Sequence, residues 1–238
     1  MEEQTATATA TGSDADRIGI VSRFFAAFFS PGRLFAHLAR RPVWLWMALL
    51  TGVLGGMLNF LVFSTEAGQN AYRQQMLDSG RTLAPEALDQ AVKITRIAAP
   101  IGAVVFTPII CLALAGIAYL IFNVILGGEG SFRHALAVGV HVFPVGILQG
   151  VLRSVLVIQK ESFQPTTSFA AFAPFLDADS PVLLFLKGID PFYLWQTGLL
   201  ALGMSVVNKL PFRKCAVILF SIYGVVLVAV VLISGLIS

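Results

Sequence analysis

The class of this protein is decided by residues 42–64, which read PVWLWMALLTGVLGGMLNFLVFS. The stretch has no charged residue and begins with Trp44 and Trp46, aromatic residues of the kind that anchor helices at the membrane surface. An α-helix rises about 1.5 Å per residue and the hydrocarbon core is about 30 Å thick, so about 20 apolar residues cross a bilayer. The stretch therefore predicts a transmembrane helix.

Four further apolar stretches follow along the chain. Three are long enough to span a bilayer, namely residues 98–126, 135–158 and 215–237. The remaining one, residues 191–208, would span only about 27 Å and needs local thinning of the bilayer or anchoring at its surface. The sequence thus predicts an all-α, polytopic integral membrane protein whose membrane domain, residues 42–238, has five transmembrane helices.

Composition supports this class. Hydrophobic residues make up 57% of the chain, charged residues only 12%, and the mean hydropathy is +0.82. A soluble domain carries about 25% charged residues, so most of this surface is expected to face the lipid bilayer. The net charge of +3 is small, and the bases lie at the ends of apolar stretches, which argues against nucleic acid as a partner. Cys111 and Cys215 fall in or beside predicted spans and are expected to be buried apolar side chains.

The N-terminal region is predicted to have two parts. Residues 1–16 are polar and of low complexity, which predicts a disordered tail and no signal peptide. Residues 17–41 predict two short amphipathic helices at the membrane interface, with Ser30-Pro31 as the N-cap and first turn of the second. That helix sets an apolar face against a basic one: Leu34, Phe35 and Leu38 against Arg33, His37, Arg40 and Arg41. The alternative is that both helices pack against the spans.

The connections between spans vary in character. Residues 65–96 look soluble and predict two short helices broken at Ser79-Gly80. Residues 127–130, GGEG, predict a tight turn, and residues 208–214, NKLPFRK, predict a short basic loop. The stretch between Gln159 and Ile189 predicts an interfacial or re-entrant cap because its apolar runs are short and broken by prolines at positions 165, 174 and 181.

The distribution of bases predicts the orientation. Arg23, Arg33, Arg40 and Arg41 precede the first span, and Lys209, Arg213 and Lys214 precede the last. Because basic residues favour the cytoplasmic side, five spans place the N-terminus in the cytoplasm and the C-terminus outside.

Polar residues inside predicted spans are candidates for function, with polar contacts between helices as the competing explanation. Arg153 and Asp190 approach the outer side together, and an ion pair between them, structural or functional, would explain both charges. His141 is a candidate proton relay or, alternatively, a hydrogen-bonding partner of a neighbouring helix. The full set is Asn59, Gln149, Arg153, Asp190 and Gln196 in the outer half, and Asn123 and His141 nearer the inner side.

No catalytic signature is present. The chain has no HExxH, no GxSxG and no phosphate-binding glycine loop, and no span carries paired carboxylates at helical spacing. We therefore expect no enzyme activity, no cofactor and no metal site.

Three segments, taken together, resemble a known family. They are Phe29–Phe35 (FSPGRLF) leading into Arg41-Pro42, Gly127–Phe132 (GGEGSF), and Asp190–Trp195 (DPFYLW) continuing to Gly198 and Gly203. In this order and spacing they resemble the Yip family of small membrane proteins, specifically its prokaryotic branch. The resemblance implies five spans, a cytoplasmic N-terminus and an outward C-terminus. It also implies a likeness to eukaryotic members that organise vesicle traffic and bind Rab-type GTPases.

Two hypotheses of function follow. The first is a non-enzymatic protein of the bacterial inner membrane that organises the bilayer or scaffolds a protein partner. Its cytoplasmic contact surface would consist of Glu129, Arg133, Lys209, Arg213 and Lys214. The alternative is a small transporter or lipid-handling protein with a polar cavity formed by Gln149, Arg153, Asp190 and Gln196. Small-residue pairs, Gly52/Gly56 and Gly146/Gly150, leave open whether helices meet within one chain or in a homo-oligomer.

Overall fold

A computed structural model of the chain describes residues 18–79, 84–164, 167–177 and 180–237, and these residues form helices and no strand. The predicted tail at 1–16 lies outside the described residues. In chain order the helices are α1 (Ile20–Phe29), α2 (Pro31–Arg40), α3 (Leu45–Ser64), α4 (Glu66–Asp78), α5 (Pro85–Tyr119), the π-helix η1 (Leu120–Ile125), α6 (Phe132–Lys160), the 3₁₀-helix η2 (Phe169–Phe172), α7 (Pro181–Gly188), α8 (Pro191–Asn208) and α9 (Phe212–Ile237).

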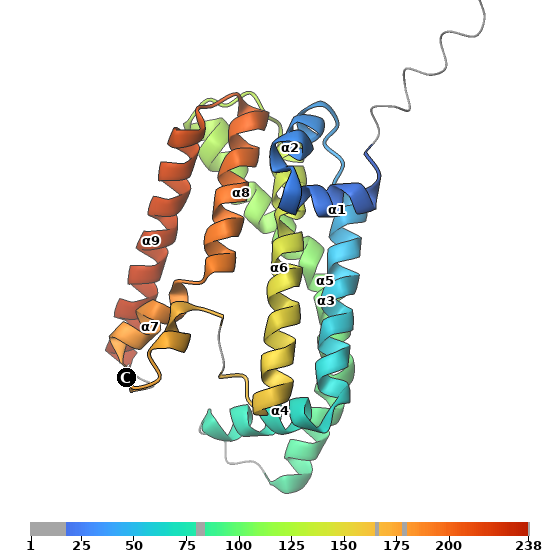
Figure 1. The fold of residues 1–238 in the computed structure, drawn as a ribbon, viewed down its shortest axis with the longest axis vertical. Coiled ribbons are helices and arrows are strands. Elements are labelled where there is room, and N and C mark those ends of the chain that lie inside the picture. The colour runs from blue at the N-terminus through green and yellow to red at the C-terminus, as the bar shows by residue number, and fades with distance from the viewer. Residues whose placement is uncertain (1–17, 80–83, 165–166, 178–179, 238) are drawn as a thin grey trace, which may run out of the picture.

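The long helices stand side by side in a bundle, and short helices close its two ends (Figure 1). α6 lies in the middle and packs against α3, α5 and α8, whereas α9 packs on α8 and on the short α7. α1 and α2 lie at one end of the bundle and α4 lies across the other. The connection from α8 to α9 returns to the end that carries α1 and α2, so the C-terminus lies at the opposite end.

Within the described part of the chain, four helical stretches are long and apolar enough to cross a membrane. They are Leu45–Ser64, Pro85–Ile125, Phe132–Lys160 and Phe212–Ser234. α8 is not among them, although it stands alongside the others with 18 residues, because Gln196 and Asn208 lower its hydropathy. The protein is thus an integral membrane protein by length and composition, with four candidate spans where the sequence predicts five.

Close packing of α3 on α5 depends on two glycines. A Cβ atom on Gly56 would lie 2.9 Å from the carbonyl oxygen of Pro100, and one on Gly52 would lie 3.4 Å from the Cα of Val104. The predicted small-residue pair therefore brings two backbones together within one chain. Gly150 on α6 likewise faces Leu58 of α3 in the same chain.

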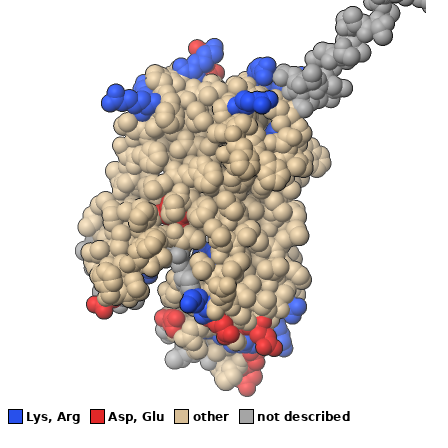
Figure 2. All heavy atoms as spheres, in the orientation of Figure 1, with Lys and Arg blue, Asp and Glu red and all other residues tan. Residues whose placement is uncertain are grey.

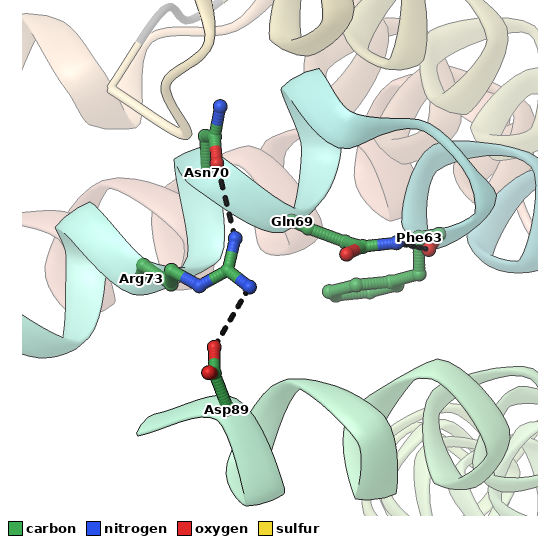
Figure 3. A network of polar contacts seen from close by, with 5 residues as sticks. All are labelled: Phe63, Gln69, Asn70, Arg73 and Asp89. Atoms are coloured by element: carbon green, nitrogen blue, oxygen red, sulfur yellow. Dashed lines mark hydrogen bonds and ion pairs between the residues drawn. The ribbon is translucent and has the colours of Figure 1, made fainter. Parts of the chain in front are cut away.

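At the end opposite α1 and α2, α4 is fastened to its neighbours by side chains (Figure 3). Arg73 donates to Asn70 at 3.0 Å and forms an ion pair with Asp89 of α5 at 2.9 Å. Gln69 donates to the carbonyl oxygen of Phe63 at 3.1 Å, which closes the turn from α3 into α4. The break in this segment falls after Asp78 as predicted, but its second helix is the start of α5, because one 35-residue helix runs on from Pro85.

The two N-terminal helices pack on the spans, which was the alternative expectation for residues 17–41. Leu34, Phe35 and Leu38 of α2 are fully buried, mainly against α8. Pro31 occupies the first turn as predicted, but the side chain of Ser30 makes no capping hydrogen bond. Of the predicted basic face, His37 is buried, whereas Arg33, Arg40 and Arg41 are exposed.

Candidate functional site

Besides the contacts of α4, polar groups gather at two further places among the described residues. The first, which we call the hairpin end, is the end of the bundle that carries α1, α2 and the glycine turn at residues 127–130. The second, which we call the notch, is a cavity of about 260 Å³ between α6 and the start of α8. Both contain residues that the sequence singled out.

Two asparagines clamp the glycine turn. Asn208, the last residue of α8, accepts a hydrogen bond from the backbone N–H of Gly130 at 3.1 Å and is buried. Asn123, in the π-helix, donates to the carbonyl oxygen of Gly128 at 3.2 Å and also to that of Gly130. The turn is therefore tied both to the helix that precedes it and to a helix 78 residues further on.

Steric constraints explain why glycine occupies these positions of the turn. A Cβ atom on Gly128 would lie 2.5 Å from Oδ1 of Asn208 and 2.6 Å from the carbonyl oxygen of Phe122. One on Gly130 would lie 2.7 Å from the same Asn208 oxygen. Gly127 has a φ of 68°, a conformation that residues with a Cβ atom adopt at a cost. The GGEG motif is thus a turn whose backbone approaches a buried amide closely.

The residues beyond the clamp fix the start of α6. Ser131 and His134 form a reciprocal capping box, with the Ser131 N–H donating to Nδ1 of His134 at 3.0 Å. The other ring nitrogen of His134 lies 3.2 Å from the carbonyl oxygen of Ala39 in α2. These contacts join the turn to the N-terminal helices.

The charged residues predicted to contact a partner all lie at the hairpin end and are exposed: Glu129, Arg133, Lys209, Arg213 and Lys214. Glu129 and Lys209 form an ion pair at 2.5 Å, which contributes little stability because both side chains are mostly exposed. Figure 2 shows basic atoms outnumbering acidic ones at this end, whereas the opposite end mixes both. The hairpin end is thus a hydrogen-bonded surface with an excess of positive charge.

The notch is built around Asp190. This carboxylate caps α8 as predicted, with Oδ1 accepting from the N–H of Phe192 at 2.8 Å. Its Oδ2 accepts from Nε2 of Gln149 at 3.0 Å and from the hydroxyl of Thr167. Asp190 is only 3% exposed and has lost its contacts with water. The three donors offset this loss, because a buried carboxylate is costly unless it is hydrogen-bonded.

The predicted ion pair between Arg153 and Asp190 is not formed. Both residues line the notch, yet no ion pair within 4.0 Å joins them in the described part of the chain, and the amide of Gln149 takes the place of the guanidinium. The remaining lining residues are Phe163, Gln164, Thr167, Lys187 and Tyr193. Figure 2 shows the hollow on this face, with acidic and basic atoms inside it.

Two other polar candidates contact the backbone of their own helices, and the buried Nε2 of His141 has no hydrogen-bond partner among the described residues. Asn59 donates back to the carbonyl oxygen of Gly55 at 2.9 Å, and Nδ1 of His141 lies 2.8 Å from the carbonyl oxygen of Ala137. Gln196 lies opposite Gly146 and does not line the notch, so the four-residue cavity expected from the sequence reduces to three residues.

One base of the N-terminal region is held inside the protein. Arg23 of α1 is 8% exposed, and its Nε has no hydrogen-bond partner among the described residues. Burial lowers the pKa of this guanidinium from its ordinary value. Arg23 therefore serves the packing of α1 on the bundle rather than the basic surface.

Sequence reasoning missed three residues of these sites. Asn208 clamps the turn, Thr167 binds Asp190, and Lys187 lines the notch. For Asn208 a signal existed, because a polar amide closes an otherwise apolar segment of the sequence. Thr167 and Lys187 come from the proline-rich cap, where no periodicity predicts which side chains turn inward.

Comparison with known proteins places the whole bundle in one family. The chain matches the Yip1 domain over residues 25–234, from α1 to nearly the end of α9. No curated protein and no solved structure matches it. The matched region includes the glycine turn, the clamp and the notch. Because the match covers most of the chain, this protein belongs to the Yip1 domain family of membrane proteins.

Proposed function

We propose that this protein is a non-enzymatic organiser of the membrane that holds a protein partner on its hairpin end. The observation that carries the proposal is the clamped turn, which fixes Glu129 and Arg133 on one rigid surface with the basic residues of the loop between α8 and α9. A preordered surface loses little conformational entropy when a partner binds. Its excess of positive charge favours a partner with an acidic surface.

The same charge pattern supports an orientation. Bases dominate the hairpin end, and the positive-inside rule assigns such an end to the cytoplasm. We take α8 as a fifth span, because it stands parallel to its neighbours and its 18 residues reach about 27 Å. Five crossings then place the C-terminus outside, in what we take to be the inner membrane of a bacterium.

Cysteine labelling tests this orientation. The background variant lacks the two buried cysteines, Cys111 and Cys215. A single cysteine is then introduced by the substitution Arg213→Cys or Glu86→Cys. A membrane-impermeant maleimide should label Glu86→Cys in intact cells and Arg213→Cys only after the membrane is opened. The reverse pattern would overturn the orientation.

Charge reversal tests the partner surface. The variant combines E129R, R133E, K209E, R213E and K214E, so that the pair between positions 129 and 209 persists with its charges exchanged. A matched control at the other end combines R73D, D89R, K93E, R96E and K160E, which preserves the pair between positions 73 and 89 and changes the net charge equally. Both are purified with crosslinking from native membranes in mild detergent.

The proposal expects a stoichiometric protein partner with the wild type and the control, and its loss with the hairpin-end variant. Because both variants keep their local ion pair, a difference between them reflects the surface rather than the fold. A partner that remains bound after the hairpin-end charges are reversed would refute the assignment of the surface.

A further inference from the structure

We propose that the notch binds the phosphate of a phospholipid, with Arg153 and Lys187 as its cationic ligands. Both side chains line the cavity, from α6 and from the last turn of α7 respectively. Neither forms an ion pair within the described residues. Such a site is independent of the partner surface, because it lies between α6 and α8 towards the opposite end of the bundle.

The charge of the notch matches a phosphodiester. Asp190 supplies one negative charge, but its oxygens already accept three hydrogen bonds and it is almost fully buried. The groups that remain for a ligand are the guanidinium of Arg153 and the ammonium of Lys187. Two cations and one carboxylate leave one net positive charge, which is complementary to the single negative charge of a phosphodiester. Charge-assisted hydrogen bonds to phosphate are the ones that these two side chains form best.

The depth of the notch suits a lipid headgroup of one leaflet. Arg153 lies seven residues before the end of α6, about 10 Å along the helix from Lys160. With α6 as a span, a phosphate there would lie below the end of this helix on the side of α4, where a soluble anion would have to leave bulk water.

Each cation also borders an apolar cavity. Lys187 lines a second cavity of about 670 Å³, whose walls include Leu156, Ala173 and Leu183. Arg153 lines a third, of about 490 Å³, between α3 and α6, whose mostly apolar wall includes Leu58 and Val157 together with the polar side chains of Asn59, Gln75 and Ser154. A headgroup phosphate held between the two cations would therefore have apolar space on both sides for its acyl chains. This arrangement favours a phospholipid over a small soluble phosphate.

The experiment uses the full chain in neutral detergent and a photoactivatable phosphatidylcholine with a diazirine in its acyl chain. The protein is wild type, R153Q/K187Q, the single variant K187Q, or the control K93Q/R96Q, which removes two exposed bases of α5 that line none of these cavities. Crosslinked peptides are mapped by mass spectrometry. A second probe is a diacylglycerol that carries the same diazirine but no phosphate. In a separate competition experiment, soluble glycerol 3-phosphate is added to the photoactivatable phosphatidylcholine.

We expect the phospholipid to crosslink to peptides of α6 and α7 beside these cavities in the wild type and the control. Loss of a charge-assisted hydrogen bond should weaken binding about tenfold in K187Q, and more in R153Q/K187Q. Equal crosslinking by diacylglycerol would mean adventitious apolar contact and overturn the proposal. Displacement by glycerol 3-phosphate would show that the notch is a site for soluble phosphates instead. Unchanged crosslinking in R153Q/K187Q would show that neither cation binds the phospholipid.

Discussion

Gly128 and Asn208 show how closely single residues fit at the hairpin end. The side chain of Asn208 occupies the space that a Cβ atom on Gly128 would need, and its amide oxygen accepts a hydrogen bond from the N–H of Gly130. A buried amide with a backbone donor at this distance stabilises the turn, and leaving that donor without a partner would cost about 1–3 kcal/mol. The shape of the partner surface therefore depends on a contact between two segments far apart in sequence.

Replacement of Gly128 by alanine tests this contact. Because the new methyl group would clash with a side-chain oxygen and a backbone oxygen, G128A should lower the free energy of unfolding by about 1–3 kcal/mol. Thermal unfolding in detergent measures the effect. G139A in α6 is the control, since a Cβ atom there meets no atom within 4 Å. Equal unfolding temperatures for the two variants would mean that the turn adapts freely.

At the same scale, the residues around Asp190 show what sequence can and cannot predict. The Asp-Pro pair predicts a helix cap correctly because capping is a local contact, two residues long. The partner of the carboxylate was predicted wrongly. Gln149 lies 41 residues away, and nothing in the sequence decides whether it or Arg153 on the same helix faces the carboxylate. Long-range polar pairing depends on how the helices are rotated in the bundle.

Among the contacts between helices, the packing of α3 on α5 is the one that the sequence predicts most clearly. The pair Gly52/Gly56 predicts close approach of another helix, and α5 approaches there. Less was predictable for α1 and α2. Their apolar and basic faces fit a membrane surface as well as a bundle, and only the structure shows Phe35 fully buried. Hydropathy alone does not distinguish burial in lipid from burial in protein.

Adjacent glycines in α3 provide a test of this packing with an internal control. In G56A the new Cβ atom would lie 2.9 Å from the carbonyl oxygen of Pro100, so α3 and α5 must move apart. In G55A the nearest atom, Cβ of Ala103, is 4.0 Å away, which is ordinary contact. We expect a clearly lower unfolding temperature for G56A than for G55A in detergent. Similar temperatures would indicate that the two helices are not held at this distance.

Across the whole molecule, the two ends of the bundle differ in charge and in construction. The hairpin end is basic and tied together by side-chain amides, whereas the opposite end mixes charges and holds α4 by the Arg73–Asp89 pair. The family match extends over both ends and the notch. We interpret this asymmetry as a division of roles, with a protein partner at one end and lipid contacts towards the other.

Site-specific photocrosslinking in native membranes shows which end of the bundle contacts a protein partner. A photoreactive amino acid replaces Arg213 at the hairpin end or, as the matched control, Glu86 at the opposite end; both positions are exposed. We expect a discrete crosslinked protein from position 213 and none from position 86. Crosslinks to a partner from position 86 alone, or none from either position, would contradict the assignment of the hairpin end as the contact surface.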